Sequence, residues 1–324
     1  ELTIRDVVGT VKIGEAAVTL DALRAVLGTG GQVNVSGGVG FSNSTPQPYA
    51  LKANVTVSNL DSGSALKAFN PSEGLPMVEG TFNLNSQIVA AGPNLVMLAE
   101  RARGDVQISS KGGIFRPLPA TYIETFVNAR NQLAKRSEQL GTLGSLAGAL
   151  GARLPPALGG TTSKAQQLVG RMGELESILR LIAEVRFDQL TLDVGGDTNL
   201  DTILRDLTIT APELRFVGKG GLKYQPDIPL WKQALSLKLT GAARGRAAEI
   251  MKKGNLLGES MDGLGYIPLS MDLNIDGTAD NPDTARLVIA LVDKVLGVQL
   301  QPGDVERIRQ GDVLVLLNVL GQLK

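Results

Sequence analysis

Polar and apolar residues alternate along much of this chain. In the segment IPLSMDLNIDGTADNP, from Ile267 to Pro282, Met271, Leu273 and Ile275 occupy every second position and polar residues separate them. A period of two predicts a β-strand with one apolar and one polar face. Gly277 then breaks the alternation, as a turn residue does. The apolar face of such a strand must meet a packed core, a partner or an apolar ligand.

Similar alternating runs recur from Leu2 to about Arg116 and again from Val185 onward, with Gly, Asn, Asp and Ser between them. Short amphipathic strands separated by turn residues predict an antiparallel sheet built from hairpins. Lys111-Gly-Gly113 and Lys219-Gly-Gly221 have the composition of hairpin turns, and we expect them to connect strands.

The period changes at Pro119. From Ile123 to Leu133 and again from Leu168 to Ile182, apolar residues fall at helical spacing. We therefore expect a helical hairpin from Pro119 to about Glu184, inserted between two sheet segments. Its middle part, from Gly141 to Gly160, is expected to be too rich in glycine for a firm helix.

Three later segments also have helical character. They are a short helix within Ala243 to Leu257, a helix from Asp283 to Val295 capped by Asn281, and the tail from Gly303. The predicted fold is a β-rich α+β fold: an elongated, curled antiparallel sheet, an open trough or half-barrel, with an inserted helical hairpin and C-terminal helices. The expected domains are a first antiparallel sheet segment (1–118), the helical hairpin insertion (119–184) and a second sheet segment with C-terminal helices (185–324).

The composition excludes several classes of function. The 324 residues include no His and no Cys, and the 32 basic residues balance the 32 acidic ones. Zinc sites built on His or Cys and nucleophile pairs that need either residue are therefore excluded. The zero net charge does not favour nucleic acid as a partner. No apolar run approaches the roughly 20 residues of a membrane-spanning helix. Glu1 opens directly on strand-like sequence without a signal peptide, so a leader or anchor is expected to lie outside this chain.

Carboxylate pairs are the remaining candidates for chemistry. Asp272 with Asp276, and Asp193 with Asp197, could support acid–base catalysis or bind a metal. Both pairs lie at strand ends beside turn glycines, where Asp is common for structural reasons. Gly28-Thr-Gly-Gly31 lacks the Lys-Ser/Thr of a phosphate-binding loop. We therefore expect no enzyme activity, no metal and no cofactor.

The apolar side of the strands is the better candidate for a binding surface. Its residues share one parity within each strand, and most of their neighbours are polar. The candidates to line an apolar trough are Val33, Val35, Val55, Val57, Phe82, Leu84, Val106, Ile108, Leu235, Leu237, Met271, Leu273 and Ile275. For any single one of them, an ordinary core position beneath the helices is the competing interpretation. The helical stripes look too few to cover every hairpin, and an uncovered apolar sheet favours aggregation unless it curls or holds a ligand.

Four stretches resemble the AsmA-like proteins of Gram-negative envelopes. NLVMLAERARGDVQISSKGGI, from Asn94 to Ile114, has the short helix, glycine, alternating strand and glycine turn of that family. YALKANVTVSNLD (Tyr49 to Asp61) and LPMVEGTFNL (Leu75 to Leu84) are similar to the strands that precede it there. Ile267 to Pro282 resembles the late element of strand, Gly-Thr and Asn-Pro that leads into a helix. The resemblance covers most of the chain outside Pro119 to Glu184.

This resemblance implies a fold, a location and a function. AsmA-like and TamB-related proteins have an inner-membrane anchor followed by a periplasmic sheet that curls into an open trough with an apolar interior. They are linked to outer-membrane biogenesis and to phospholipid movement between the inner and outer membranes. By that likeness the expected partners are a phospholipid or another acyl-chain ligand, the two membranes or envelope proteins, and no nucleic acid. The protein would be periplasmic.

The energetics of lipid transfer agree with an apolar surface that carries no catalytic groups. Exposing about thirty methylenes to water costs roughly 24 kcal/mol at about 0.8 kcal/mol each, so a carrier needs a continuous apolar surface. Two other classes remain open at this point. A structural or scaffold protein of the envelope, with a closed sheet core and no lipid cargo, would show the same alternation. An enzyme such as a glycosidase would need two acids that face each other across a cleft.

Overall fold

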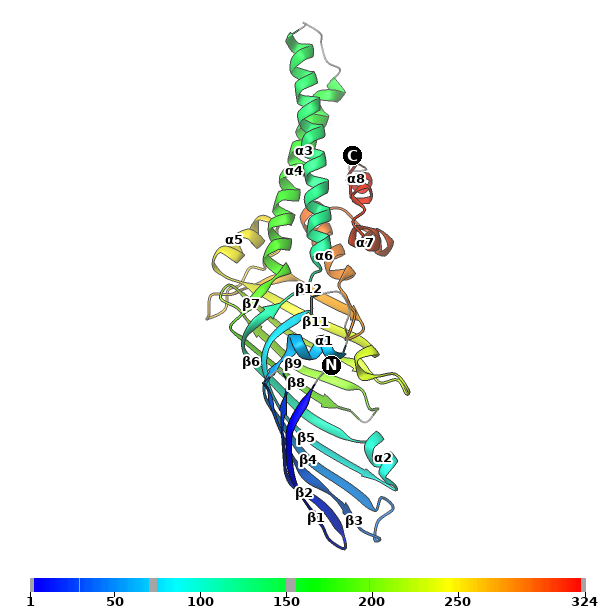
Figure 1. Ribbon diagram of the computed structural model, residues 1–324. Coiled ribbons are helices and arrows are strands. Elements are labelled where there is room, and N and C mark those ends of the chain that lie inside the picture. Colours follow the sequence, from blue (N-terminus) through cyan, green and yellow to red (C-terminus); the bar gives the residue numbers. More distant parts are fainter. Residues whose placement is uncertain (1–2, 29, 70–74, 150–155, 198, 322–324) are drawn as a thin grey trace. The chain divides into compact units, whose positions relative to one another are not determined.

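The structure is a computed structural model that describes residues 3–28, 30–69, 75–149, 156–197 and 199–321 (Figure 1). The chain divides into two compact units that interleave in sequence. The sheet unit comprises Glu1–Phe115, Arg186–Thr240 and Asn274–Asp283, and the helical unit comprises Arg116–Val185, Gly241–Leu273 and Thr284–Lys324. The boundaries expected from the sequence run consecutively along the chain, whereas the sheet unit gathers segments from both sides of the helical insertion and the helical unit joins the insertion to two later segments.

A 13-stranded sheet runs in the order β1-β2-β3-β4-β5-β6-β8-β9-β10-β11-β12-β13, and β7 pairs with β6 beside this path. Its strands are β1 (Ile4–Ile13), β2 (Ala17–Leu27), β3 (Gln32–Phe41), β4 (Tyr49–Asp61), β5 (Val78–Gly92), β6 (Arg103–Phe115), β7 (Val185–Phe187), β8 (Gln189–Gly196), β9 (Thr202–Thr210), β10 (Leu214–Lys223), β11 (Ala234–Ala243), β12 (Ile267–Gly277) and β13 (Pro282–Asp283). The order has two separate ends, so the sheet does not close on itself. The predicted β-rich fold with an open antiparallel sheet is confirmed.

The strands before and after the helical insertion pair directly. Val106 of β6 lies opposite Val194 of β8, and Ile108 lies opposite Leu192. The sheet segments that flank the insertion are therefore neighbours in one sheet, because the insertion leaves the sheet after β6 and the chain returns beside the same strand.

Eight helices and one 3₁₀ turn accompany the sheet in the described part of the chain. They are α1 (Ser62–Phe69), α2 (Leu95–Glu100), α3 (Ala120–Ala149), α4 (Pro156–Ala183), η1 (Leu230–Lys232), α5 (Gly245–Lys253), α6 (Ala285–Leu296), α7 (Pro302–Arg309) and α8 (Val313–Gly321). The predicted helical hairpin is confirmed by α3 and α4, and the predicted C-terminal helices by α6, α7 and α8. None of the helices in the described ranges combines the length and the apolar character needed to cross a bilayer.

Two expectations about helix bounds were wrong. The glycine-rich stretch from Gly141 to Gly160 is helical where the structure describes it, because α3 continues to Ala149 and α4 already begins at Pro156, while residues 150–155 lie outside the described ranges. A glycine costs a helix only about 1 kcal/mol relative to alanine, and the alanines and leucines between these glycines favour helix. The late helix begins at Ala285, after Thr284, instead of at Asp283. Pro282–Asp283 forms β13, which pairs with Asp276 and Gly277 of β12 across a tight turn.

The two glycine pairs expected as hairpin turns lie inside strands instead. Lys111-Gly-Gly113 belongs to β6 and Lys219-Gly-Gly221 belongs to β10, and each strand has a register shift there. A Cβ on Gly113 would lie 2.5 Å from Cζ of Phe187 and would overlap the backbone oxygen of Glu79. Glycine is present at this position because neighbouring backbone and a ring approach too closely for a side chain.

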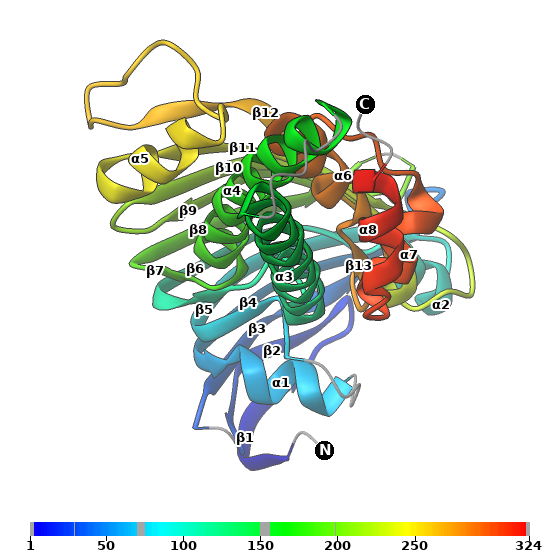
Figure 2. The same cartoon turned by 90° about the horizontal axis from the view of Figure 1, so that it is seen from above.

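Each unit has its own core. In the sheet unit, the rings of Phe115 and Phe216 pack edge to face with centroids 5.7 Å apart. In the helical unit, Ile178 and Val288 are fully buried, and the Thr125 hydroxyl donates to the backbone oxygens of Thr121 and Ile308, which ties α3 to α7. Helices α1 and α2 belong to the sheet unit and pack on β4 and β5 at opposite ends of those strands (Figure 2).

Candidate functional site

The apolar residues of neighbouring strands form continuous rows across the sheet. Strand pairing places side chains of the same parity opposite one another, so each row runs perpendicular to the strands. Row 1 is Ala25, Val33, Val57, Leu84, Ile108, Leu192 and Leu207. Row 2 is Leu23, Val35, Val55, Ser86, Val106, Val194 and Leu204. Each row crosses strands β2 to β6, β8 and β9, which gives a length of about 29 Å along the sheet at the usual strand spacing of about 4.8 Å.

Seven of the predicted lining residues therefore lie in these two rows. They are Val33, Val35, Val55, Val57, Leu84, Val106 and Ile108. All seven side chains are half-buried, while the polar residues between them are mostly exposed. A half-buried apolar side chain still has surface that a ligand can cover. These residues keep their place as candidates for an acyl-chain contact.

Phe82, Leu235 and Leu237 lie at the margins of this surface. Phe82 is buried opposite Ser110, one row beyond Row 1, at the end of β5 where α1 packs. Leu235 and Leu237 are half-buried on β11. Row 1 continues from Leu207 to Gly218, where a Cβ would collide with Cδ2 of Leu239 and would lie 3.4 Å from Cδ1 of Leu237. The Leu239 side chain thus occupies the space that Gly218 leaves open, and Leu237 lies beside it.

The three predicted residues of β12 differ from the others. Met271 is half-buried, but Leu273 and Ile275 are only 2% and 0% exposed. Their alternation is the same as that of Val55 and Val57, yet protein atoms already cover them. A ligand has no surface to contact at Leu273 or Ile275, and a charge at Leu273 is expected to destabilise the fold instead of blocking a binding surface.

Strand pairing adds residues that the sequence interpretation left out. Leu192, Val194, Leu204 and Leu207 complete the two rows on β8 and β9. The alternation in β8 and β9 was visible in the sequence. It could not show that these strands continue the same rows, because that depends on the pairing of β6 with β8. Ser86 is the polar member of Row 2, and it is buried between Val55 and Val106.

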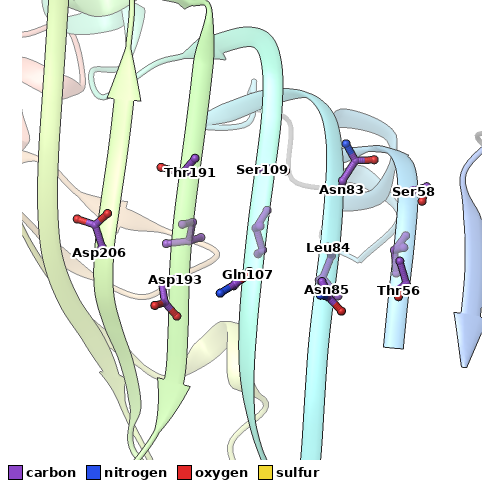
Figure 3. Close-up of a pocket in the computed structure, with 13 residues that line it drawn as sticks. Thr56, Ser58, Asn83, Leu84, Asn85, Gln107, Ser109, Thr191, Asp193 and Asp206 are labelled. Carbon is purple, nitrogen blue, oxygen red and sulfur yellow. The ribbon is translucent and has the colours of Figure 1, made fainter. Parts of the chain in front are cut away.

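The same central strands line a hollow of about 470 Å³, to which polar residues of the opposite parity and four residues of Row 1 both contribute (Figure 3). Its polar lining comes from Thr56, Ser58, Asn83, Asn85, Gln107, Ser109, Thr191, Asp193 and Asp206, with Val57, Leu84, Ile108 and Leu192 between them. Seven of the thirteen lining residues carry an amide or a hydroxyl group. The two faces of the central strands thus differ in chemistry, with aliphatic side chains on one and hydrogen-bonding groups on the other.

The carboxylates of this hollow lie side by side. Asp193 and Asp206 are cross-strand neighbours on β8 and β9. The Arg205 guanidinium pairs with Asp105 and lies 3.7 Å from the Asp193 carboxylate. It also occupies the space above Gly195, where a Cβ would collide with it. The two carboxylates therefore come from one face of one sheet, whereas a glycosidase needs acids on opposing sides of its substrate.

The pair proposed from the sequence, Asp193 and Asp197, does not form a joint site. The Asp197 carboxylate accepts the backbone N–H groups of Asn199 and Asp201 at 2.8 and 2.9 Å and closes the β8–β9 turn. No group of three or more Asp or Glu side chains within the described ranges is placed to hold a metal ion. Comparisons of the chain with protein-family models, with curated proteins and with solved structures found no match.

Proposed function

We propose that the protein is a non-enzymatic periplasmic envelope protein that holds acyl chains along Rows 1 and 2 and serves phospholipid transport between the inner and outer membranes during outer-membrane biogenesis. The observation that carries this proposal is the continuity of the rows. Seven strands contribute aliphatic side chains to Row 1, six of them do so in Row 2 with Ser86 of β5 as the exception, and neither row contains a charged residue. The resemblance to AsmA-like proteins in four stretches of the sequence supports the envelope assignment.

The dimensions of the rows suit a lipid tail. One leaflet of a bilayer holds its acyl chains within about 15 Å, half of the roughly 30 Å hydrocarbon core. A row of about 29 Å is therefore longer than an extended tail. A tail that lies along a row can move from strand to strand while it remains in contact with Val, Leu and Ile side chains. Each methylene that stays covered avoids about 0.8 kcal/mol of exposure to water.

A matched pair of variants on β4 tests the proposal. Val55→Arg places a charge in Row 2, between Val35 and Ser86. Asn54→Arg places the same charge at the adjacent residue of β4, on the opposite face of the sheet. An unpaired charge beneath an acyl chain costs several kcal/mol, on the order of 2–7 for a buried polar group without a partner. Phospholipid that co-purifies with the parent, measured by native mass spectrometry and solvent extraction, should be lost from Val55→Arg and retained by Asn54→Arg. Both variants should melt close to the parent, because Val55 is only half-buried.

Two results would contradict the proposal. If both variants bind as much phospholipid as the parent, the rows are not the binding surface. If the parent never carries lipid and Val55→Arg melts far below Asn54→Arg, the rows belong to a closed core. That second outcome is the one expected of an envelope scaffold.

A further inference from the structure

One end of the sheet carries large apolar side chains that protein atoms leave uncovered. In α2, Leu95 and Val96 are 60% and 67% exposed, although Leu98 of the same helix is buried against Gly92. In η1, Leu230 and Trp231 are 54% and 45% exposed. These four residues form what we call the apolar rim.

Strand pairing places both parts of the rim at the same end of the sheet. Helix α2 follows the last residue of β5, and η1 lies in the loop that follows the last residue of β10. Between them, the β8–β9 turn lies at the same end, and the backbone N–H of Tyr224 donates to the Asp201 carboxylate at 2.8 Å. Figure 1 shows α2 at this end of the strands. Along the sheet order β5-β6-β8-β9-β10-β11, the five spacings between these six strands place the two parts about 24 Å apart.

The loop that presents Trp231 is held in place by hydrogen bonds. The backbone oxygen of Trp231 accepts the N–H of Asp280 at 2.9 Å. The Gln233 side chain is buried and donates to the backbone oxygen of Ile228 at 3.2 Å. Lys232 donates its N–H to the oxygen of Pro229 at 2.9 Å. Because the loop is already ordered, presenting Leu230 and Trp231 to a partner requires little further loss of conformational entropy.

The chemistry of the rim fits a bilayer better than a protein. A protein interface has a contiguous apolar core with a polar border, whereas the rim consists of two separate apolar tips. Tryptophan is enriched at membrane–water interfaces, where its ring lies at the level of the headgroups, and the neighbouring Lys232 can extend its ammonium group to the headgroups. The carboxylates of the intervening turn, Asp197 and Asp201, already accept backbone N–H groups.

We propose that the apolar rim docks on the surface of a lipid bilayer, with Leu230 and Trp231 inserted at one point and Leu95 and Val96 at the other. The docking does not depend on acyl chains bound along the two rows, because no rim residue belongs to either row. It would give the sheet a defined end that meets the membrane.

The sequence contains a single tryptophan, so the intrinsic fluorescence of Trp231 reports on the rim without any label. We expect its emission to shift to shorter wavelength when phosphatidylcholine vesicles are added, and to be quenched when the vesicle lipids carry brominated acyl chains. Leu230→Asp and Val96→Asp should each weaken vesicle partitioning about tenfold or more, since each removes a full aliphatic side chain from the bilayer. Leu75→Asp is the matched control. Leu75 is 70% exposed, but it lies before the first residue of β5, at the opposite end of that strand from α2.

The proposal is overturned if vesicles cause neither the shift nor the quenching, or if Leu75→Asp weakens partitioning as much as Leu230→Asp. A shift that depends on protein concentration in the absence of vesicles would mean that the rim is an interface between copies of this chain. Val55→Arg separates this proposal from acyl-chain binding: it should lose co-purified lipid and keep the vesicle-induced quenching. If the vesicle-induced quenching is present in the parent but lost in Val55→Arg, Trp231 senses lipid bound in the rows and not a bilayer.

Discussion

The same aliphatic residues meet two different surroundings in the two units. In the helical unit, Ile178 of α4 is fully buried, and a Cβ on Gly254 would collide with its Cδ1 atom. In the sheet unit, Ile108 of β6 is half-buried, between Leu84 and Leu192 of the neighbouring strands. Both residues are isoleucines with apolar neighbours. They differ in whether a second layer covers them.

This difference separates two uses of apolar surface. Ile178 contributes to stability, since its whole side chain is removed from water when the unit folds. Ile108 is removed only in part, and the remaining surface is available to a ligand. A surface that binds a lipid must leave such apolar area exposed to water in the free protein, so it stabilises the fold less than a core of equal size does.

Truncation of the two isoleucines gives the largest expected effect. Ile178→Ala should lower the free energy of unfolding of the helical unit by about 2–5 kcal/mol, because it leaves a cavity in a close-packed site. Ile108→Ala should lower the free energy of unfolding of the sheet unit by only about 1 kcal/mol. The change removes three carbon groups at about 0.8 kcal/mol each, and about half of that applies because Ile108 is half-buried. Urea unfolding of lipid-free protein measures both, with Trp231 fluorescence for the sheet unit and circular dichroism at the helix band for the helical unit. Equal losses would mean that the rows are covered like a core.

Two three-membered ion clusters extend the comparison to charged groups. In the helical unit, the Glu176 carboxylate lies 2.5 Å from Arg130 and 2.8 Å from Arg180, and its side chain is 12% exposed. In the sheet unit, Arg205 lies between Asp105 and Asp193 with a 46% exposed side chain. Solvent screens the exposed cluster far more than the covered one.

Replacing the central residue of each cluster should therefore have unequal effects. Glu176→Gln should cost about 1–2 kcal/mol of unfolding free energy, because Arg180 loses a charged hydrogen-bond acceptor and Arg130 loses its ion-pair partner in a covered site. Arg205→Gln should cost at most about 0.5 kcal/mol, and that cost should vanish at 1 M NaCl. Urea unfolding at low and high salt measures both. A larger cost for Arg205→Gln would show that the polar face of the sheet is more enclosed than its exposure indicates.

The sequence was sufficient for the strands and for the parity of their faces. Val55, Leu84 and Val106 were assigned to one apolar side because a period of two determines which side chains share a face. The change of period at Pro119 likewise located the helical hairpin. These features are local, and local sequence determines them.

Covering layers and strand partners could not be predicted in the same way. Leu273 and Val55 lie in equally regular alternating runs, yet Leu273 is buried and Val55 is half-buried. Alternation defines a face and contains no information about what lies against it. Similarly, Gly113 was assigned to a turn because composition cannot distinguish a turn glycine from one that admits a close backbone contact. The apolar rim was missed because Trp231 and Leu95 are far apart in sequence and only strand order brings them to the same end.

The smallest expected difference is in the response of the helical unit to acid. Asp312 accepts two N–H groups from the Arg307 side chain at 3.0 and 2.6 Å, and it accepts the backbone N–H of Leu314 at the start of α8. The hydrogen bond from Arg307 is the main cause that lowers the pKa of Asp312 below its ordinary value of 3.8, with the positive charge of Arg307 and the backbone N–H groups acting in the same direction. A carboxyl whose pKa is lower in the folded state stabilises that state fully above the ordinary value. This stabilisation is lost as the pH falls through the lowered pKa.

The helical unit should accordingly lose a small part of its stability below pH 3.8 that Asp312→Asn does not lose, since the amide does not titrate. Urea unfolding at pH 7 and at pH 3, followed at the helix band, measures the difference between the parent and the variant. Carbon-13 NMR of the Asp312 carboxyl measures the pKa itself, and Arg307→Gln should raise it toward the ordinary value because the main hydrogen-bond donor is gone. If Asp312 titrates at the same pH with and without Arg307, the pair does not contribute to the stability of the helical unit. The acid response would then no longer distinguish that unit from the sheet.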